Sequence, residues 1–478
     1  MTSNNLASLI QQHAIARPGK VAIELGDTTL TYLEIWQRIV SLSQWLADQG
    51  CVPGSRIAVA LPETIDHVLM QFAVPAIGGV YIPVDHRWST NEQQAAISSF
   101  GAQLLIGGDH NTLATPLPET LPATTQVELA PGDDQDWLIS LSSGSTGRPT
   151  GALVTHRHMR ERFIAQWVTL GFNIEDRFAL VTPLCFGAGR SFSMSTLAAG
   201  ATLIVAPPPM APEAVVDYLT SHRASATFMV PTLLRRLAKV TGKKPLLPML
   251  RRLLLSGEPT SASEARVFQA DICPNLIGYY ASSEGGGISV LQPDDFTSHA
   301  HTVGQAAFGV DIDIVDHHDV PVGDNEPGRL RYRGPGVTNR LLDADGRLQQ
   351  DDDGWFYPGD LADRDSDGYI TLRSRSKDVI VRSGINIYPA ELERVISSLD
   401  GVSQVVVVGV PCTARGESVH AWVVGAVTVD ALEAHCKQHL ARYKQPETFH
   451  LTSHMPLTPA GKIDRQSLRN ASATNAGN

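Results

Sequence analysis

The stretch from Leu141 to His156 reads LSSGSTGRPTGALVTH and sets a run of glycines and hydroxylated residues between apolar segments. Glycines let the backbone approach a ligand closely, and serine and threonine hydroxyls donate hydrogen bonds to phosphate oxygens. The apolar residues before the loop and the segment GALVTH after it argue against a flexible linker. The stretch therefore predicts a polyphosphate-binding loop that follows a strand, although the lysine of a Walker loop is absent.

The composition predicts a soluble chain of more than one domain. With 478 residues, 43% of them hydrophobic, the chain is too long for a single core. Charged residues make up 18%, and the net charge of −11 argues against nucleic acid or an anionic membrane surface as the main partner. The five cysteines are scattered, and there is neither a secretory leader nor a run of about 18 apolar residues. We expect a cytoplasmic protein that neither spans a membrane nor binds nucleic acid.

Helical patterns and short apolar runs alternate in the first part of the chain. Residues 31–50 predict an amphipathic helix, because Thr31 and Glu34 form a capping-box pattern and apolar residues then recur at helical spacing. Short apolar runs occur at 56–62, 79–84, 103–107, 201–207, 226–231 and 251–259. The alternation predicts α/β layers built on parallel strands.

The sequence pattern changes twice toward the C-terminus. Between 305 and 375, short strand patterns separated by Gly, Asp and Pro turns predict a small antiparallel section or barrel. After Lys377, helix and strand patterns form a compact α+β set, so we expect domains at 1–377 and 378–478. The small, polar tail 470–478 predicts disorder.

Seven further segments carry distinctive motifs along nearly the whole chain: LTYLEI (30–35), GGVYIPVD (78–85), LSGEPTSA (255–262), YASSEGG (280–286), YPGDLADRDSDGYITLRSRSKD (357–378), SGINIYPAELE (383–393) and PLTPAGKIDR (456–465). Together with the loop SSGSTGRPTG, they resemble the motifs of the adenylate-forming, or AMP-binding, superfamily. That superfamily includes acyl-CoA synthetases, nonribosomal adenylation enzymes and firefly luciferases. Chance agreement at eight ordered places is remote.

This resemblance implies a fold and a reaction. The fold has a large α/β N-terminal domain, made of two α/β subdomains and a small β-barrel-like section, and a smaller mobile α+β C-terminal domain. Members activate a carboxylate by attack on the α-phosphorus of ATP, release pyrophosphate and pass the acyl-adenylate to a thiol. The resemblance places the hinge between the domains at Asp378 and a loop that admits the thiol at Gly384.

The resemblance also implies the residues that hold ATP and Mg²⁺. Lys462 matches the lysine that reaches the attacking carboxylate and the α-phosphate, Glu284 matches the acid that holds Mg²⁺, and Thr146 is a third catalytic candidate. Outside such motifs, Lys462 and Glu284 would be ordinary surface charges. The other implied ATP-binding residues are Ser142, Ser143, Gly144, Ser145, Thr146 and Gly147 in the phosphate loop, Ser256, Gly257 and Glu258 beside adenine, Tyr280 stacked on adenine, Ser283 near the phosphates, and Asp360 and Arg375 at the ribose.

One residue of the phosphate loop departs from the superfamily pattern. Thr150 stands where a lysine usually meets the β- or γ-phosphate, and threonine offers only a hydroxyl. Arg148 either supplies the missing charge or is a solvated loop arginine, and the second alternative is favoured. Because Lys462 and Arg375 are retained, we expect weaker handling of ATP or pyrophosphate rather than loss of the chemistry.

The residues that match the acyl pocket disfavour an α-amino acid. Phe186 stands where amino-acid adenylation domains have an aspartate for the substrate ammonium, which would otherwise be desolvated without a partner. Gly285, Gly286 and Gly287 are expected to leave room beside the acyl channel. Arg190 either faces the pocket, where it binds a second carboxylate or a polar tail, or is a helix-surface charge, which the sequence favours.

The sequence leaves three functions open. The first is an acyl-CoA synthetase that uses ATP, Mg²⁺ and coenzyme A to activate a small carboxylic acid, because RSGINIYPAELE (382–393) resembles that branch. The second is a stand-alone adenylating enzyme that loads the phosphopantetheine of an acyl- or peptidyl-carrier protein, because GGVYIPVDHRW (78–88) resembles nonribosomal adenylation domains. The third is a non-catalytic nucleotide-binding relative. The missing lysine at Thr150 favours this function, and the presence of Lys462 and Glu284 argues against it. A homodimer is also left open.

Overall fold

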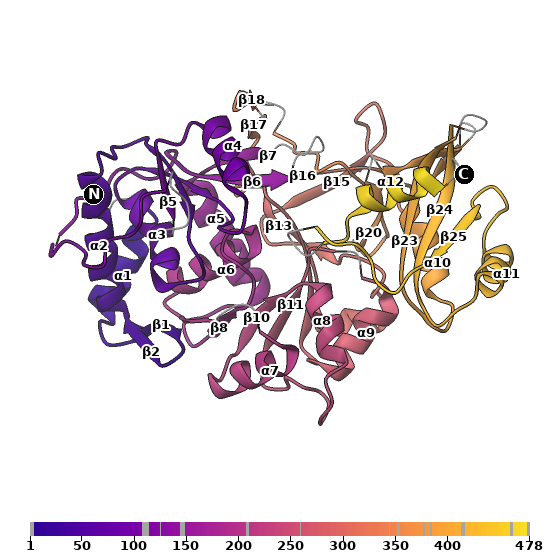
Figure 1. The fold of residues 1–478 in the computed structure, drawn as a ribbon, viewed down its shortest axis with the longest axis horizontal. Coiled ribbons are helices and arrows are strands. Elements are labelled where there is room, and N and C mark those ends of the chain that lie inside the picture. The colour runs from indigo at the N-terminus through magenta and orange to yellow at the C-terminus, as the bar shows by residue number, and fades with distance from the viewer. Residues whose placement is uncertain are drawn as a thin grey trace.

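The computed structural model describes residues 4–107, 114–124, 126–143, 149–206, 210–258, 260–343, 345–350, 354–375, 378–382, 385–412, 416–458 and 462–475. Two large sheets with their helices form the body of the molecule, and a smaller sheet with its helices carries the C-terminus (Figure 1). This architecture confirms the large α/β N-terminal domain and the smaller α+β C-terminal domain. In the part of the chain that the structure describes, no helix combines the length and the apolar character needed to cross a membrane.

The first large sheet has nine strands: β1 (Val21–Leu25), β2 (Thr28–Thr31), β8 (Arg177–Leu180), β9 (Thr202–Val205), β10 (Ala226–Met229), β11 (Arg252–Leu255), β12 (Leu276–Ser282), β13 (Gly286–Leu291) and β14 (Gln305–Ala306). Their order is β14-β13-β12-β11-β10-β8-β9-β1-β2. The strands from β12 to β1 run parallel, and the outer pairs are antiparallel. Because helices cover both faces of the parallel part, its strands are continuous apolar runs, as the sequence indicates.

The second large sheet has seven strands: β3 (Arg56–Ala60), β4 (Val80–Pro83), β5 (Leu104–Gly107), β6 (Asp136–Ser143), β7 (Pro149–Thr155), β17 (Arg340–Leu342) and β18 (Leu348–Gln350). Their order is β18-β17-β7-β6-β4-β3-β5. Strands β5, β3, β4 and β6 run parallel, whereas β7, β17 and β18 extend the sheet in antiparallel fashion. The parallel strands therefore end at the same edge as β6, where the phosphate loop begins.

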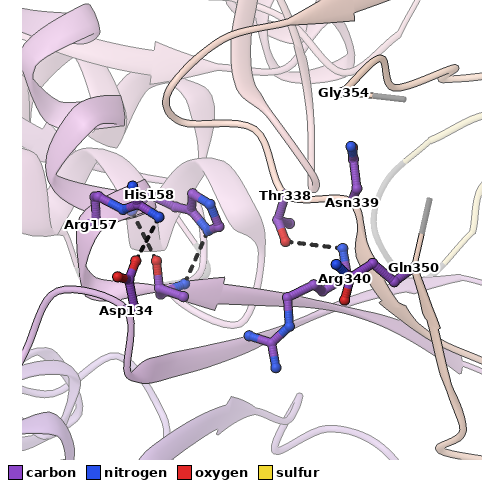
Figure 2. Close-up of a pocket in the computed structure, with 9 residues that line it drawn as sticks. Asp134, Arg157, His158, Thr338, Asn339, Arg340, Gln350 and Gly354 are labelled. Carbon is purple, nitrogen blue, oxygen red and sulfur yellow. Dashed lines mark hydrogen bonds and ion pairs between the residues drawn. The ribbon is translucent and has the colours of Figure 1, made fainter. Parts of the chain in front are cut away.

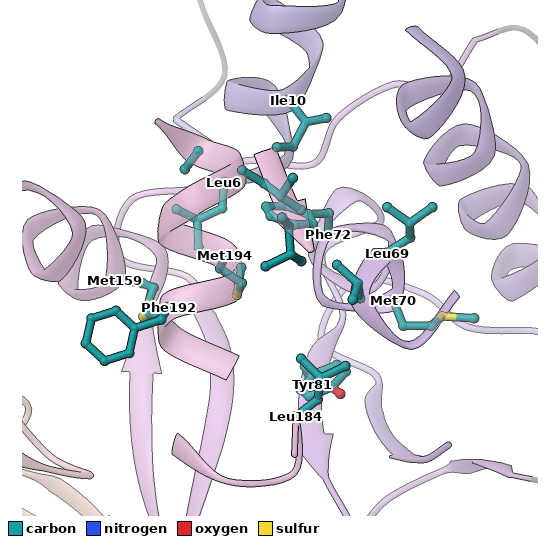
Figure 3. Close-up of a cluster of buried hydrophobic side chains, with 14 of the residues drawn as sticks. Leu6, Ile10, Leu69, Met70, Phe72, Tyr81, Met159, Leu184, Phe192 and Met194 are labelled. Carbon is teal, nitrogen blue, oxygen red and sulfur yellow. The ribbon is translucent and has the colours of Figure 1, made fainter. Parts of the chain in front are cut away.

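A shared core joins the two large sheets. It contains apolar side chains from both sheets and from the helices between them, among them Phe72, Tyr81 and Phe192 (Figure 3). Burying one side chain of this size contributes about 1.5–3 kcal/mol to stability, so the strand ends of both sheets are held in a fixed relation. The helices between the sheets are α3 (Ile65–Ala76), α5 (His156–Leu170) and α6 (Gly187–Ala198).

The other helices extend the shared core or cover the outer faces of the sheets. Phe268 and its apolar neighbours bury the second face of the nine-stranded sheet, and Phe100 packs on the outer face of the seven-stranded sheet. Thr31 and Glu34 form the predicted capping box, so the helix expected at 31–50 is confirmed. These helices are α1 (Ala7–Ala16), α2 (Tyr32–Asp48), α4 (Thr90–Phe100), α7 (Pro212–Ser221), α8 (Pro231–Ala238), α9 (Ala262–Asp271) and the short η1 (Pro293–Thr297).

The small antiparallel section expected between 305 and 375 is a four-stranded sheet of β15 (Asp311–Val315), β16 (Gly328–Arg333), β19 (Asp360–Arg364) and β20 (Ile370–Arg375). One strand of the same region, β17, joins a different sheet. Leu341 and Leu342 of β17 pair with β7 and so belong to the seven-stranded sheet, where Leu342 is buried in the core. Local sequence does not specify which sheet a short strand joins, because the pairing partner lies far away in the chain.

The C-terminal domain consists of β21 (Ile380–Arg382), β22 (Ile385–Ile387), β23 (Val402–Cys412), β24 (Gly416–Gly425), β25 (Thr448–Leu451), α10 (Pro389–Ser397), α11 (Val429–His439) and α12 (Arg465–Asn475). The boundary between 377 and 378 stays a prediction. The expectation of disorder from 470 onward is wrong up to Asn475, because α12 continues there. Ser472 is buried, and its hydroxyl accepts a hydrogen bond from the Trp422 indole at 2.9 Å, which fixes the helix to β24.

Acid sensitivity of the fold follows from buried histidines. His67 is 0% exposed, with its ring nitrogens 3.1 Å from the Pro62 carbonyl and 3.1 Å from the Tyr81 hydroxyl, and burial lowers its pKa to about 4. Because the unfolded chain has a His pKa of about 6.5, it binds more protons than the native state between pH about 6.5 and about 4. Stability is therefore lost as the pH falls through this window, by up to ~3 kcal/mol for this residue.

We expect His67→Gln to weaken the pH dependence of the melting temperature between pH 6.5 and 4. The exposed His454 provides the matched control, because His454→Gln removes a histidine without changing the core. Melting curves recorded by circular dichroism across this pH range measure the effect. An unchanged slope for His67→Gln would show that this histidine does not cause the acid sensitivity.

Candidate active site

The candidate site lies where parallel strands of the two large sheets end. Ligands of α/β sheets bind at the carboxyl ends of the strands, because the loops there are free to contact them. Strand β6 ends at Ser143 and β12 ends at Ser282, and the motifs predicted to bind phosphate and Mg²⁺ lie at these two ends. Arg190 of α6 donates to the Ser140 hydroxyl of β6 at 3.1 Å, so a helix packed on the first sheet reaches the end of the second.

The predicted phosphate loop connects β6 and β7, which pair in antiparallel fashion. Ser142 pairs with Thr150 and Ser143 pairs with Pro149 in the antiparallel ladder of β6 and β7. Thr150 therefore lies at the base of the loop, directly across from one of its predicted phosphate-binding serines. The loop residues Gly144, Ser145, Thr146, Gly147 and Arg148 lie outside the described residues, as does Gly384, and their roles stay predictions.

Glu284 lies in the tight turn between β12 and β13. The Ser282 hydroxyl accepts hydrogen bonds from the backbone N–H groups of Glu284 at 3.2 Å and Gly285 at 3.0 Å. From the opposite side, the Thr338 N–H donates to the Glu284 carbonyl at 3.0 Å. The backbone of the turn is thus fixed, whereas no described residue forms a hydrogen bond or ion pair with the Glu284 carboxylate.

Arg162 of α5 holds the same turn from the core. Its Nη1 donates to the Ser283 carbonyl at 3.3 Å, its Nη2 donates to the Glu284 carbonyl, and its Nε donates to the Gly336 carbonyl at 2.8 Å. The residue is 7% exposed, and burial lowers the pKa of its guanidinium to about 10. The sequence alone does not identify Arg162, because nothing in its own helix marks an arginine whose partners lie more than a hundred residues away.

Tyr280 and the two ribose candidates lie together. The Tyr280 hydroxyl donates to the carboxylate of the buried Asp360, which joins β12 to β19. In the ladder of β19 and β20, Asp360 stands opposite Arg375, so both predicted ribose ligands belong to one strand pair. The side chain of Arg375 lies outside the described part of the chain.

The wall predicted to lie beside adenine follows β11. Gly257 has φ of +105°, a conformation that favours glycine. The Glu258 carboxylate points to α8, where it accepts from the Thr232 hydroxyl at 2.9 Å and from Arg235 Nη1 at 3.0 Å, and its side chain is 2% exposed. The carboxylate of Glu258 therefore holds α8 in place, and only its backbone is left to form the wall with Ser256 and Gly257.

Phe186 and Arg190 lie at the start of α6. Phe186 immediately precedes the helix, and the Arg87 guanidinium lies 5.8 Å from the centre of its ring. Arg190 is 3% exposed, so the helix-surface position favoured by the sequence is wrong. The chain turns so tightly before the helix that a Cβ on Gly189 would lie 2.3 Å from the Pro183 carbonyl oxygen. This turn directs the first turn of α6 into the molecule instead of toward solvent.

The glycines after Glu284 are required by close packing. A Cβ on Gly285 would lie 2.4 Å from the Tyr332 ring, and a Cβ on Gly287 would lie 2.3 Å from the Tyr279 hydroxyl. These two positions accept no larger side chain, because the fold brings aromatic rings from β16 and β12 against them, and both glycines line a small cavity. The assignment of Gly285 and Gly286 to the acyl channel stays a prediction.

The C-terminal domain contacts α8, which lies beside the predicted adenine wall. In the amide orientation that satisfies both groups, the Gln404 side-chain oxygen of β23 accepts from Arg235 Nε at 3.0 Å and Nη1 at 3.1 Å, and Arg235 also holds Glu258. Lys462 is exposed in the turn before α12, where its carbonyl accepts from the Thr458 N–H at 2.7 Å. The hinge at Asp378 and the catalytic role of Lys462 stay predictions.

A pocket of about 360 Å³ lies at the end of β7 that is remote from the phosphate loop (Figure 2). Its wall includes the ion pair of Arg157 and Asp134, with an N–O distance of 2.6 Å, and the buried Thr338. None of the predicted site residues lines this pocket. The candidate active site and this pocket are therefore separate features.

The chain belongs to the family of AMP-binding enzymes. The model of the AMP-binding enzyme family matches residues 10–342, and the model of the AMP-binding enzyme C-terminal domain matches residues 391–462. A feruloyl-CoA synthase from an Amycolatopsis species is 30% identical, covering 98% of this chain and 99% of the relative. A 2-succinylbenzoate–CoA ligase from Bacillus licheniformis is 27% identical over 96% of this chain and 98% of its own.

A solved structure shares the whole fold. The ATP-bound MatB protein from Rhodopseudomonas palustris superposes with a TM-score of 0.89 at 23% identity, over 98% of this chain and 99% of that one. The family models and the relative at 30% identity confirm the predicted superfamily. The chain is a ligase of the AMP-forming acyl-CoA synthetase type, as the sequence indicates.

Proposed function

We propose that this enzyme activates a carboxylic acid other than an α-amino acid with ATP and then transfers the acyl group to coenzyme A. In the first step the carboxylate oxygen attacks the α-phosphorus and pyrophosphate leaves. In the second step the thiol sulfur attacks the acyl carbonyl carbon and AMP leaves. The observation that carries the proposal is the turn at Glu284. Its backbone is fixed from both sides, and its carboxylate is left for a ligand at the strand ends beside the Tyr280–Asp360 pair.

The chain fits a magnesium ion that is held mostly by nucleotide. Mg²⁺ usually keeps several waters and binds one or two carboxylates together with substrate phosphates. Glu284 offers one such carboxylate, and the described residues contain no cluster of three or more His, Cys, Asp or Glu that would form a cage. When bound, the ion would neutralise charge on the phosphates. Glu284 would hold it, and Arg162 would keep Glu284 in position.

The remaining residues position ATP and the acid and neutralise the charge on the α-phosphate. Asp360 accepts from ribose hydroxyls, Tyr280 covers adenine, and Lys462 places an ammonium between the attacking carboxylate and the α-phosphate. Phe186 offers an apolar wall to the acyl group, and no acid at that position receives an α-ammonium. The relatives named for ferulate and for 2-succinylbenzoate support an acid with an aromatic ring or a second carboxylate.

Two thiols are candidates for accepting the acyl group. Coenzyme A is supported by the names of the relatives, and a carrier-protein phosphopantetheine remains the second candidate because of the segment 78–88. Free coenzyme A and a carrier protein that bears a phosphopantetheine with a free thiol, offered in parallel with the same acid, distinguish the two acceptors. Faster thioester formation on the carrier protein would overturn the choice of coenzyme A.

A hydroxylamine-trapping screen over a panel of carboxylic acids tests the activation step. Hydroxylamine captures the acyl-adenylate as a hydroxamate, so the readout does not depend on the acceptor. We expect hydroxamate and pyrophosphate with at least one class of acid, and neither with α-amino acids. Absence of both products with every acid would instead support a non-catalytic nucleotide-binding relative.

Thr150→Lys is expected to lower the KM for ATP severalfold. The residue lies at the base of the phosphate loop, where an ammonium would add one ion pair with the polyphosphate. Initial rates at saturating acid and varied ATP measure the change, and Thr150→Gln is the uncharged control of similar length. An unchanged KM for the lysine variant would refute the idea that Thr150 weakens ATP handling.

A further inference from the structure

Arg190 is a buried guanidinium that has no anionic partner among the residues that the structure describes. It is 3% exposed, and its two hydrogen bonds go to neutral groups: Nη1 donates to the Cys185 carbonyl at 3.2 Å, and Nη2 donates to the Ser140 hydroxyl at 3.1 Å. No carboxylate in the described part of the chain pairs with it. An arginine has five N–H donors, so most of the hydrogen-bonding capacity of Arg190 is left for a ligand.

Other inward-pointing arginines of this protein do have acidic partners. Arg252 pairs with Asp176 at 3.0 Å, Arg235 with Glu258 at 3.0 Å, and Arg465 with Glu393 at 2.8 Å. A buried charge without a counter-ion destabilises the fold. Arg162 shares the lack of a carboxylate partner, but three backbone carbonyls engage its guanidinium. Arg190 is therefore the exception that needs an explanation.

None of the described carboxylates near Arg190 pairs with it. Tyr81 and Cys185 are the groups that interact most strongly with its charge, and burial raises the pKa of both, to about 12 for Cys185, so both are neutral at pH 7. The nearby Asp85 already forms a paired set of hydrogen bonds with Arg87, and the Glu63 carboxylate accepts from the Leu184 N–H at 3.3 Å. The next cation in the core, Arg162, adds positive charge to the same region. The field around Arg190 thus favours an incoming anion.

The position of Arg190 connects it with the reacting end of the substrate. It lies in the first turn of α6 beside Phe186, and the α6 N-terminus has no side-chain cap, so its positive dipole end adds to the field. Its partner Ser140 precedes Ser143, the last residue of β6 before the predicted phosphate loop, by three residues. At about 3.3 Å per residue, ~10 Å separates Ser140 from the end of the strand. An acid of modest length can span this distance.

We propose that Arg190 binds a second anionic group of the acid, so that the preferred substrate is a dicarboxylate whose one carboxylate is activated while the other pairs with this guanidinium. The proposal rests on the function proposed above and specifies its substrate class. It explains why the fold tolerates an unpaired buried cation, because substrate binding supplies the counter-ion. The same pairing selects against simple monocarboxylates of equal size.

The test compares each dicarboxylate with its own monomethyl ester, which keeps the length and removes one charge. The series runs from succinate to suberate and includes terephthalate, and the readout is kcat/KM for acid-dependent pyrophosphate release. For the best-fitting dicarboxylate we expect a preference of about 100-fold over its ester in the wild-type enzyme. In Arg190→Met the preference should fall to less than about threefold, and Arg190→Lys should keep part of it.

Arg252→Met is the matched control, because it also removes a partly buried arginine but one that is paired with Asp176 in a different part of the fold. It should lower stability and leave the preference unchanged. Arg190→Met should melt no lower than the wild type without ligand, because it removes an unpaired buried charge. A wild-type preference near one for every pair, or an unchanged preference in Arg190→Met, would overturn the proposal.

Calorimetric titration with the dicarboxylate separates this proposal from the proposed function. Binding does not require the adenylate to form. Tight binding to the wild type and at least tenfold weaker binding to Arg190→Met would support the anion site even if no acid were activated. If monocarboxylates are activated while dicarboxylates neither bind nor react, the proposed function stands and the role of Arg190 falls.

Discussion

Lys462→Ala is expected to reduce the rate of acyl-adenylate formation about 1000-fold while leaving the fold intact. A positioned charge aimed at the developing transition state typically contributes 10²- to 10³-fold to the rate. The side chain is exposed in the turn before α12, so its removal leaves no cavity and should not change the melting temperature. The rate of pyrophosphate release at saturating ATP and acid measures the loss.

A second readout distinguishes a catalytic Lys462 from a general defect. Transfer of the acyl group from a preformed adenylate to coenzyme A should proceed nearly normally in Lys462→Ala, because the resemblance assigns that step to the loop at Gly384. Lys437→Ala, at an exposed position of α11, is the control for removing a lysine from the same domain. Pyrophosphate release within threefold of the wild type would contradict the assignment of Lys462.

Arg162→Met is expected to reduce kcat/KM for MgATP by about 10- to 100-fold. Residues that orient a metal-binding side chain commonly have effects of this size. The variant removes the guanidinium from three carbonyls, two of which belong to Ser283 and Glu284, so the turn that presents the Glu284 carboxylate loses its support from the core. The deficit should be largest at low Mg²⁺ and should shrink as Mg²⁺ is raised, which a mere loss of folded protein would not produce.

Two variants on the same helix sharpen this test. Arg162→Lys keeps the charge but reaches fewer carbonyls, so an intermediate deficit is expected. Arg160→Met removes an arginine that faces the surface and pairs with Asp133, and it should leave the Mg²⁺ dependence unchanged. A loss of activity in Arg162→Met that is independent of Mg²⁺ and matches a lower melting temperature would show that Arg162 stabilises the fold without positioning Glu284.

The contact between Gln404 and Arg235 connects the C-terminal domain to the residues that hold the predicted adenine wall. Arg235 binds Glu258 and Glu264 within the N-terminal domain and also donates to a side chain of β23. A hydrogen bond across this contact contributes only about 0.5–1.5 kcal/mol. A bond of this size would not prevent the domain rotation that the resemblance implies.

The sequence by itself determined the features that depend on near neighbours. The apolar runs, the capping box at Thr31 and the glycine and hydroxyl pattern of the phosphate loop all follow from residues within a few positions of one another. Such patterns fix backbone conformation and which face of an element is buried. The motifs in their order along the chain identify the family, and the resemblance names Tyr280, Glu284, Asp360 and Arg375 as candidate site residues.

Only the tertiary structure decided which of these groups are satisfied and which are left for ligands. From the sequence, Arg190 is either a surface charge or a pocket residue. In the structure it is buried beside Ser140, and no described carboxylate pairs with it. Glu258 belongs to a wall motif, yet Arg235 holds its carboxylate. The physical reason is the same in each case. Desolvation and the choice of hydrogen-bond partner depend on residues tens to hundreds of positions away, and only the packed sheets bring those residues into contact.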